Sequence, residues 1–181
     1  MDTYFEIVNL IFDYLIKGIF ISVFVIVFVR SFFKKIDTQM AIRIVQWMMI
    51  AYSMSVLFWL IISSTRVNSS SDFSERATGP YWFAYWLMAL SGLLPILFFI
   101  KKLSRKVYFI LFVSVFINIG WLFESFVIHV TSMHRDYDIK GINPWLPSVA
   151  EWFLILRGLL VGVVALVIGN IIHKVEMHKS T

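Results

Sequence analysis

The sequence contains no cysteine among its 181 residues. Disulfides, cysteine-ligated iron–sulfur clusters, covalently attached haem and thiol nucleophiles are therefore excluded, because each of them requires a cysteine sulfur. Charged residues are also scarce: they make up 15% of the chain, whereas a soluble domain usually has about 25%. Hydrophobic residues reach 60% and the mean hydropathy is +0.82. These values exclude a soluble globular domain and predict a polytopic membrane protein.

Histidine, the other common ligand of redox metals, is rare as well. The chain has four, His129, His134, His173 and His178. Only His129 falls within a long apolar stretch, so a haem held by two histidines between helices is not expected. We expect the chain to bind no cofactor and no metal of its own.

Five apolar stretches are long enough to cross a bilayer, whose core requires roughly 20 residues of helix. They cover about residues 10–32, 42–62, 81–100, 107–130 and 152–172. Polar or charged segments separate them, and no repeat or second domain is evident. The sequence therefore predicts an all-α protein in which residues 1–181 form a single bundle of five transmembrane helices.

Basic residues predict the orientation of this bundle. Ten of the sixteen lysines and arginines flank the first connection, the third connection or the C-terminal end, and only four lie on the opposite side. By the positive-inside rule, the N-terminus is then outside and the C-terminus cytoplasmic. This distribution also accounts for the basic pI of about 9.5 without a nucleic acid partner.

Aromatic residues gather at the predicted outer end of the third span. Tyr81, Trp82, Tyr85 and Trp86 repeat there at four-residue spacing, and Trp121 lies on the following span. An interfacial belt is the ordinary explanation of such residues. The repeat also fits a docking surface for a partner protein or ligand.

Four ionisable residues interrupt the apolar spans at similar depth. Asp13 and Lys17 in the first span, Glu124 in the fourth and Arg157 in the fifth all fall in the outer third of the bilayer. Asp13 with Lys17, and Glu124 with Arg157, could form ion pairs that lock helix packing. Alternatively, they line a polar pocket or proton path in which Glu124 is the protonatable group.

Asn118 lies about two turns inward of Glu124, close to the predicted midplane. It could continue a polar path together with Tyr52 or Gln46. Those two assignments depend on which side of each helix points toward Asn118. Hydrophobic periodicity cannot give this orientation for a helix that is apolar on every side.

A second polar group follows the fourth span on the predicted outer face. It consists of His129, His134, Arg135 and Asp136. His134 and Asp136 could act as acid and base or hold a metal, but polar residues are also ordinary where a helix leaves the membrane. Pro95, in the third span, is expected to kink that helix.

Several of these aromatic and polar blocks occur in an order that resembles a known family. The blocks are GPYWFAYWLM at 79–88, the basic pair Lys101 and Lys102, NIGWLFE at 118–124 and VTSMHRD at 130–136. The sequence resembles the C-terminal half of the NrfD/polysulfide reductase membrane subunits, and within them the quinol-oxidising subunits of alternative complex III. The likeness covers about residues 36–136.

This resemblance implies a cofactor-free membrane subunit that docks against an iron–sulfur protein on the outer face and handles quinol there. It also implies proton transfer through polar helix residues, with Glu124 and the run from His134 to Asp136 matching the family motif. Ser125 stands where the family has a basic residue, and Arg157 or Lys17 could supply that charge. This chain resembles only the C-terminal half of the family, whereas the family's quinone site is associated with the helical bundle of the other half.

We therefore expect a multi-pass subunit of a respiratory or redox complex in the bacterial inner membrane. Its partners would be iron–sulfur, multihaem or other membrane subunits, and quinol would bind at a shared interface. The alternatives are a stand-alone carrier of an ion or small solute, a scaffold of a non-redox complex or, third, a membrane enzyme.

Overall fold

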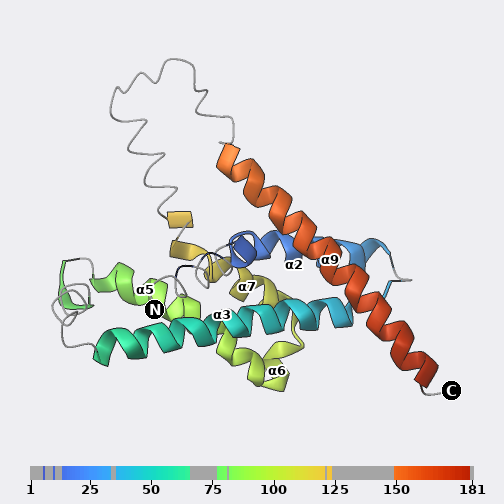
Figure 1. Ribbon diagram of the computed structural model, residues 1–181, viewed down its shortest axis with the longest axis horizontal. Helices are drawn as coiled ribbons and strands as arrows, with labels where there is room; N and C mark the ends of the chain where they lie inside the picture. Colours follow the sequence, from blue (N-terminus) through green and yellow to red (C-terminus); the bar gives the residue numbers. More distant parts are fainter. Residues whose placement is uncertain are drawn as a thin grey trace, which may run out of the picture.

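The computed structural model of the chain describes residues 6, 10, 14–33, 36–65, 77–80, 82–120, 122–123 and 149–179. Every regular element in these segments is a helix, and none of the described residues forms a strand. The predicted all-α fold is thus confirmed (Figure 1).

Four helical segments are long and apolar enough to cross a membrane: Tyr14–Phe32, Gln39–Ile62, Trp82–Phe99 and Trp152–His178. They correspond to helix α2 (Ile19–Phe32) with the turn before it, α3 (Gln39–Thr65), α5 (Trp82–Leu93) with η2 (Leu94–Phe99), and α9 (Val149–Lys179). These agree with the first, second, third and fifth predicted spans, and the chain is a multi-pass membrane protein.

The fourth predicted span, residues 107–130, is described over residues 107–120 and 122–123. Helix α7 (Val107–Phe116) begins where that span was expected to begin, after the short helix α6 (Lys101–Ser104). The remainder of the span, beyond residue 123, lies outside the described residues. The count of five spans and the orientation in the bilayer therefore stay predictions.

Pro95 changes the geometry of the third span. The α-helical hydrogen bonding of α5 stops at Leu93, and the chain continues as the 3₁₀ helix η2 with Pro95 in its first turn. This follows from the missing amide hydrogen of proline and from the clash of its ring with the preceding turn. The predicted distortion at Pro95 is observed.

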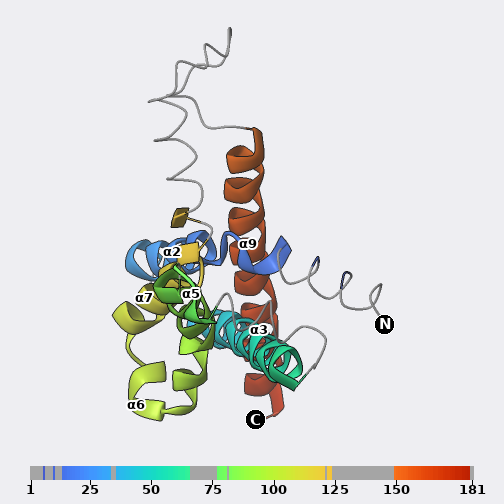
Figure 2. The same cartoon turned by 90° about the vertical axis from the view of Figure 1, so that its left-hand side faces the viewer.

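Helix α9 crosses both α2 and α3, which are its main neighbours (Figure 1). Helix α2 also packs against α7, and α3 packs against α5 and η2. In the perpendicular view, α9 stands along one side of the other helices (Figure 2). The first and last spans are therefore in direct contact although they are far apart in the sequence.

The core lies where α2, α3, α7 and α9 meet. Its fully buried side chains include Ile19 and Ile26 from α2, Met49 from α3 and Val113 from α7. In the most apolar 18-residue stretch of α9, only 28% is buried inside the protein. Most of this stretch therefore presents apolar side chains outward. Such a distribution fits a bundle that is surrounded by lipid or by other membrane subunits.

Small residues allow α9 to approach its neighbours closely. A Cβ at Gly162 would lie 3.2 Å from the Ser22 Cα of α2, and one at Gly169 would lie 2.8 Å from the Ala41 amide nitrogen of α3. Close backbone approach maximises van der Waals contact, which drives helix association in lipid because lipid tails are as apolar as the side chains.

The first turn of α3 is joined to the end of α9. Asp37 Oδ1 accepts a hydrogen bond from the Gln39 amide at 2.8 Å, which satisfies one of the free donors of the helix start. Asp37 Oδ2 lies 3.2 Å from His173 Nδ1 of α9. One aspartate therefore both caps α3 and contacts the C-terminal part of α9.

Candidate functional site

The first span is not one continuous helix. Residues 14–16 are helical, Lys17 and Gly18 form a turn, and α2 restarts at Ile19. Gly18 has φ of +108°, a conformation that glycine tolerates and L side chains rarely adopt. The predicted span agrees with the apolar segment Tyr14–Phe32, but the sequence did not indicate the turn within it.

A break in a membrane helix frees backbone groups that must find other partners, because lipid offers none. The Gly18 carbonyl accepts hydrogen bonds from the amides of Ile21 at 2.9 Å and Ser22 at 3.3 Å. On the other side of the break, the Ile16 carbonyl accepts a hydrogen bond from the side chain of Asn118. The irregular segment is thus satisfied by protein groups.

Asn118 follows α7 and is 4% exposed. Its Nδ2 donates to the Ile16 carbonyl at 3.3 Å and to the Ser114 carbonyl at 3.1 Å. The structure therefore gives Asn118 a definite contact, the broken end of the first span. The predicted depth of Asn118 in the bilayer stays a prediction.

Helix α9 packs directly against the break in the first span. Ser22 Oγ donates to the Gly158 carbonyl at 2.7 Å, and both residues are buried. A Cβ at Gly158 would lie 2.5 Å from the Gly18 carbonyl oxygen, so only glycine fits at this crossing. We call the contact of Gly18, Ser22, Asn118 and Gly158 the polar crossing.

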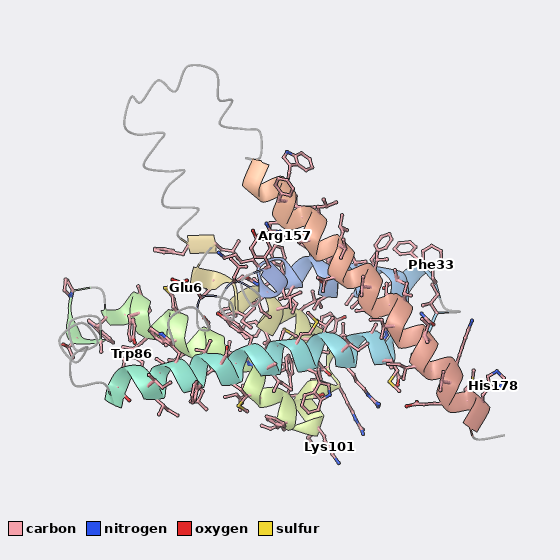
Figure 3. The ribbon with its side chains drawn as sticks, in the orientation of Figure 1. Glu6, Phe33, Trp86, Lys101, Arg157 and His178 are labelled. Atoms are coloured by element: carbon pink, nitrogen blue, oxygen red, sulfur yellow. The ribbon has the colours of Figure 1, made fainter. Side chains whose placement is uncertain are left out.

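Two of the predicted intramembrane charges flank the polar crossing. Lys17 directly precedes Gly18 and Arg157 directly precedes Gly158, and both are half-buried. The guanidinium carbon of Arg157, which is labelled in Figure 3, lies 3.9 Å from the ring centroid of Tyr14 in a cation–π contact. Lys17 and Arg157 thus adjoin the same helix contact in sequence, their common depth in the bilayer stays a prediction, and Tyr14 is a partner that the sequence did not indicate.

The other predicted members of the charged layer, Asp13 and Glu124, lie outside the described residues. The same holds for the outer polar group of His129, His134, Arg135 and Asp136. Within the part of the chain that the structure describes, no group of His, Asp and Glu could hold a metal ion.

Gln46 does not continue a path from Asn118. Its Nε2 donates to the Ser104 carbonyl at 2.7 Å, which joins α3 to the end of α6. The suggestion that Gln46 extends the Asn118 path was therefore wrong, because the facing of α3 could not be read from an apolar helix. Tyr52 packs against the hydrophobic core.

The aromatic docking surface is described for three of its five residues, since Tyr81 and Trp121 lie outside the described ones. Trp82 is 53% exposed, Trp86 is 38% exposed and Tyr85 is half-buried. The indole of Trp86, which is labelled in Figure 3, donates to the Ala77 carbonyl at 3.1 Å and meets the Tyr85 ring edge-on. Trp82 and Trp86 thus present open aromatic area at the start of α5.

The residues that sequence reasoning missed are Gly18, Ser22 and Gly158. A signal existed in the glycines of α9, since Gly158 and Gly162 are four residues apart and small residues at this spacing mark close helix contacts. Gly18 gave no comparable signal, because single glycines are common in transmembrane helices.

Comparisons with protein-family models, curated proteins and solved structures gave no match to this chain. The resemblance to the NrfD/polysulfide reductase family therefore stays a prediction from the residues that suggested it.

Proposed function

We propose that the chain is an integral membrane subunit of a bacterial respiratory or redox complex in the inner membrane. In this role it supports quinol-linked electron transfer without a redox centre of its own. Iron–sulfur, multihaem or other membrane subunits carry the electrons, and quinol binds at an interface shared with them. Two features of the described residues support the proposal, in addition to the order of the motif blocks.

The observation that carries the proposal is the pair of cations at the polar crossing. Lys17 and Arg157 flank one helix contact inside the apolar span region. Cations inside a membrane span usually pair with carboxylates, because a charge at the centre of a membrane helix costs about 2.5–3.5 kcal/mol even on insertion scales. Asp13 and Glu124, at similar predicted depth, are the carboxylates that could supply this charge. This arrangement supports Glu124 as the proton-exchanging group.

The second supporting feature is the exposed aromatic area of Trp82 and Trp86. Aromatic residues are enriched where proteins bind one another, because a rigid ring buries a large area at small entropic cost. In this proposal, the start of α5 contacts the partner subunit on the outer face.

The proton role is tested with Glu124→Gln, which keeps the size of the side chain and removes its charge. We expect quinol-driven proton movement by the complex in proteoliposomes to be lost while the subunits still assemble. Glu176→Gln, the same change at an exposed position of α9, is the matched control and should leave proton movement unchanged. Normal proton movement in Glu124→Gln would overturn the proton role.

The break at Gly18 favours a second candidate, a stand-alone carrier of an ion or small solute. Many transporters bind their substrates near the midplane, where discontinuous helices expose backbone groups. Purification of the tagged native protein in mild detergent separates the two. Haem-containing and iron–sulfur subunits in stoichiometric amounts support the redox subunit, whereas a colourless protein without such partners supports the carrier.

A further inference from the structure

A cavity of about 580 Å³ opens between the end of α2, the first turns of α3 and the α6 turn, far from the polar crossing. Figure 3 shows Lys101 at this lower side of the molecule and Arg157 at the upper side. Four basic side chains line the cavity: Arg30, Arg43, Lys101 and Arg105. We call it the cationic pocket.

These four cations come from three segments of the chain. Arg30 lies in the last turn of α2, Arg43 lies near the start of α3, and Lys101 and Arg105 lie in α6 and directly after it. The positive-inside rule explains why basic residues occur in the first and third connections. It does not explain why the fold brings them around one cavity.

Among the described residues, none of those that line the cationic pocket is acidic. The carboxylate of Asp37, close by in the sequence, contacts His173 and the Gln39 amide. Four like charges around one cavity repel each other, and an anion bound among them would remove this repulsion. The pocket therefore favours a negatively charged ligand.

The remaining walls of the pocket define the ligand further. Buried Gln46 hydrogen-bonds the Ser104 carbonyl at 2.7 Å, which fixes α3 against the α6 turn. Ile42, Val107 and Ile110 add an apolar wall. A ligand with an anionic head and an apolar stem would contact both the basic side chains and the apolar wall. A free inorganic anion would contact only the basic side chains.

We propose that the cationic pocket binds the phosphate headgroup of an anionic phospholipid. Arginine suits this role, since its planar guanidinium forms two parallel hydrogen bonds to phosphate oxygens. The volume lies within the usual range of ligand pockets, about 300–1,000 Å³. Basic pockets between membrane helices on the cytoplasmic side bind such headgroups, and this is the side predicted for these connections. The proposal does not depend on the redox role.

The experiment measures lipid binding to the purified full chain by native mass spectrometry, with phosphatidylglycerol and phosphatidylcholine added at equal concentration. We expect the unmodified chain to retain phosphatidylglycerol and to retain phosphatidylcholine much less. Inorganic phosphate in large excess should not displace the bound lipid. This comparison requires no variant, so it holds even if a variant fails to fold.

Two double variants then locate the site. Lys101→Gln with Arg105→Gln removes two cations that line the pocket, whereas Lys102→Gln with Lys106→Gln removes the same charge from exposed neighbours that do not line it. We expect the pocket variant to bind phosphatidylglycerol about 25-fold more weakly, since each basic residue near an anionic headgroup contributes a factor of about five. The control variant should bind within about two-fold of the unmodified chain, because it leaves all four lining cations in place.

Equal loss in both double variants would overturn the proposal, because it would indicate general surface charge. Equal retention of the two lipids by the unmodified chain would overturn it as well. Displacement of the lipid by inorganic phosphate at similar concentration would show that the pocket takes a soluble anion instead of a lipid.

Discussion

Gly158 provides the sharpest test of the polar crossing, because a single methyl group would meet backbone there. In Gly158→Ala, the new Cβ would lie 2.5 Å from the Gly18 carbonyl oxygen and 2.7 Å from the Ile21 Cβ. Ordinary contacts begin at 3.4 Å, so the oxygen is 0.9 Å too close. Neither atom belongs to the flexible end of a side chain. Helices α2 and α9 must therefore separate to accept the methyl group.

The expected loss follows from two opposing contributions. Overpacking a close contact costs about 1–3 kcal/mol, and a clash with backbone belongs at the upper end of that range. Alanine is favoured over glycine inside a helix by about 1 kcal/mol, which offsets part of the loss. We expect Gly158→Ala to lower the free energy of unfolding by about 2 kcal/mol.

Gly162→Ala is the matched comparison, one turn further along the same helix. Its Cβ would lie 3.2 Å from the Ser22 Cα, only 0.2 Å inside ordinary contact. The clash is then small and the helix propensity of alanine compensates for it, so we expect a change below about 0.5 kcal/mol. Unfolding in mild detergent with rising dodecyl sulfate, followed by tryptophan fluorescence, measures both variants. Equal stability of the two would refute the close crossing of α2 and α9.

Two further predictions concern side chains at the same crossing. Asn118→Leu removes the donor to the Ile16 carbonyl, and we expect a loss of about 0.6–1.7 kcal/mol in the same unfolding assay, the size of interhelical hydrogen bonds in membranes. A variant as stable as the parent would contradict that hydrogen bond. Tyr14→Leu removes the aromatic ring beneath Arg157 and should cost about 1 kcal/mol, whereas Tyr14→Phe keeps a ring and should cost less. Equal losses in the two Tyr14 variants would argue against a cation–π contact.

The sequence predicts the helices well because their physical cause is local. An apolar run of sufficient length forms a helix in lipid, so α3 and α9 appear where the hydropathy places them. Pro95 likewise acts through its own ring and missing amide hydrogen. The structure buries the Asn118 side chain, whereas its depth in the bilayer, counted along the span, stays a prediction.

The facing of the helices could not be predicted in the same way. Gln46 was assigned to a path with Asn118, but it binds the Ser104 carbonyl near the cationic pocket. Nothing in an apolar helix distinguishes one face from another, so such partners are set by tertiary packing alone. The turn at Gly18 has a similar origin, since Asn118 and α9 contact it in addition to the local amides of Ile21 and Ser22.

The hydrogen bonds at Gly18 also bear on how the protein is made. Ser22 and its acceptor Gly158 are 136 residues apart, and Asn118 is 102 residues beyond the Ile16 carbonyl that it satisfies. At synthesis rates of about 5–20 residues per second, the first span waits on the order of ten seconds for its partners to leave the ribosome. During that interval the Ile16 carbonyl and the Ser22 hydroxyl face lipid or the insertion machinery without these partners. The first helix therefore acquires all of its hydrogen-bond partners only when the last helix, α9, has been inserted. A nascent chain arrested before α9 would present a recognisable defect to membrane quality control.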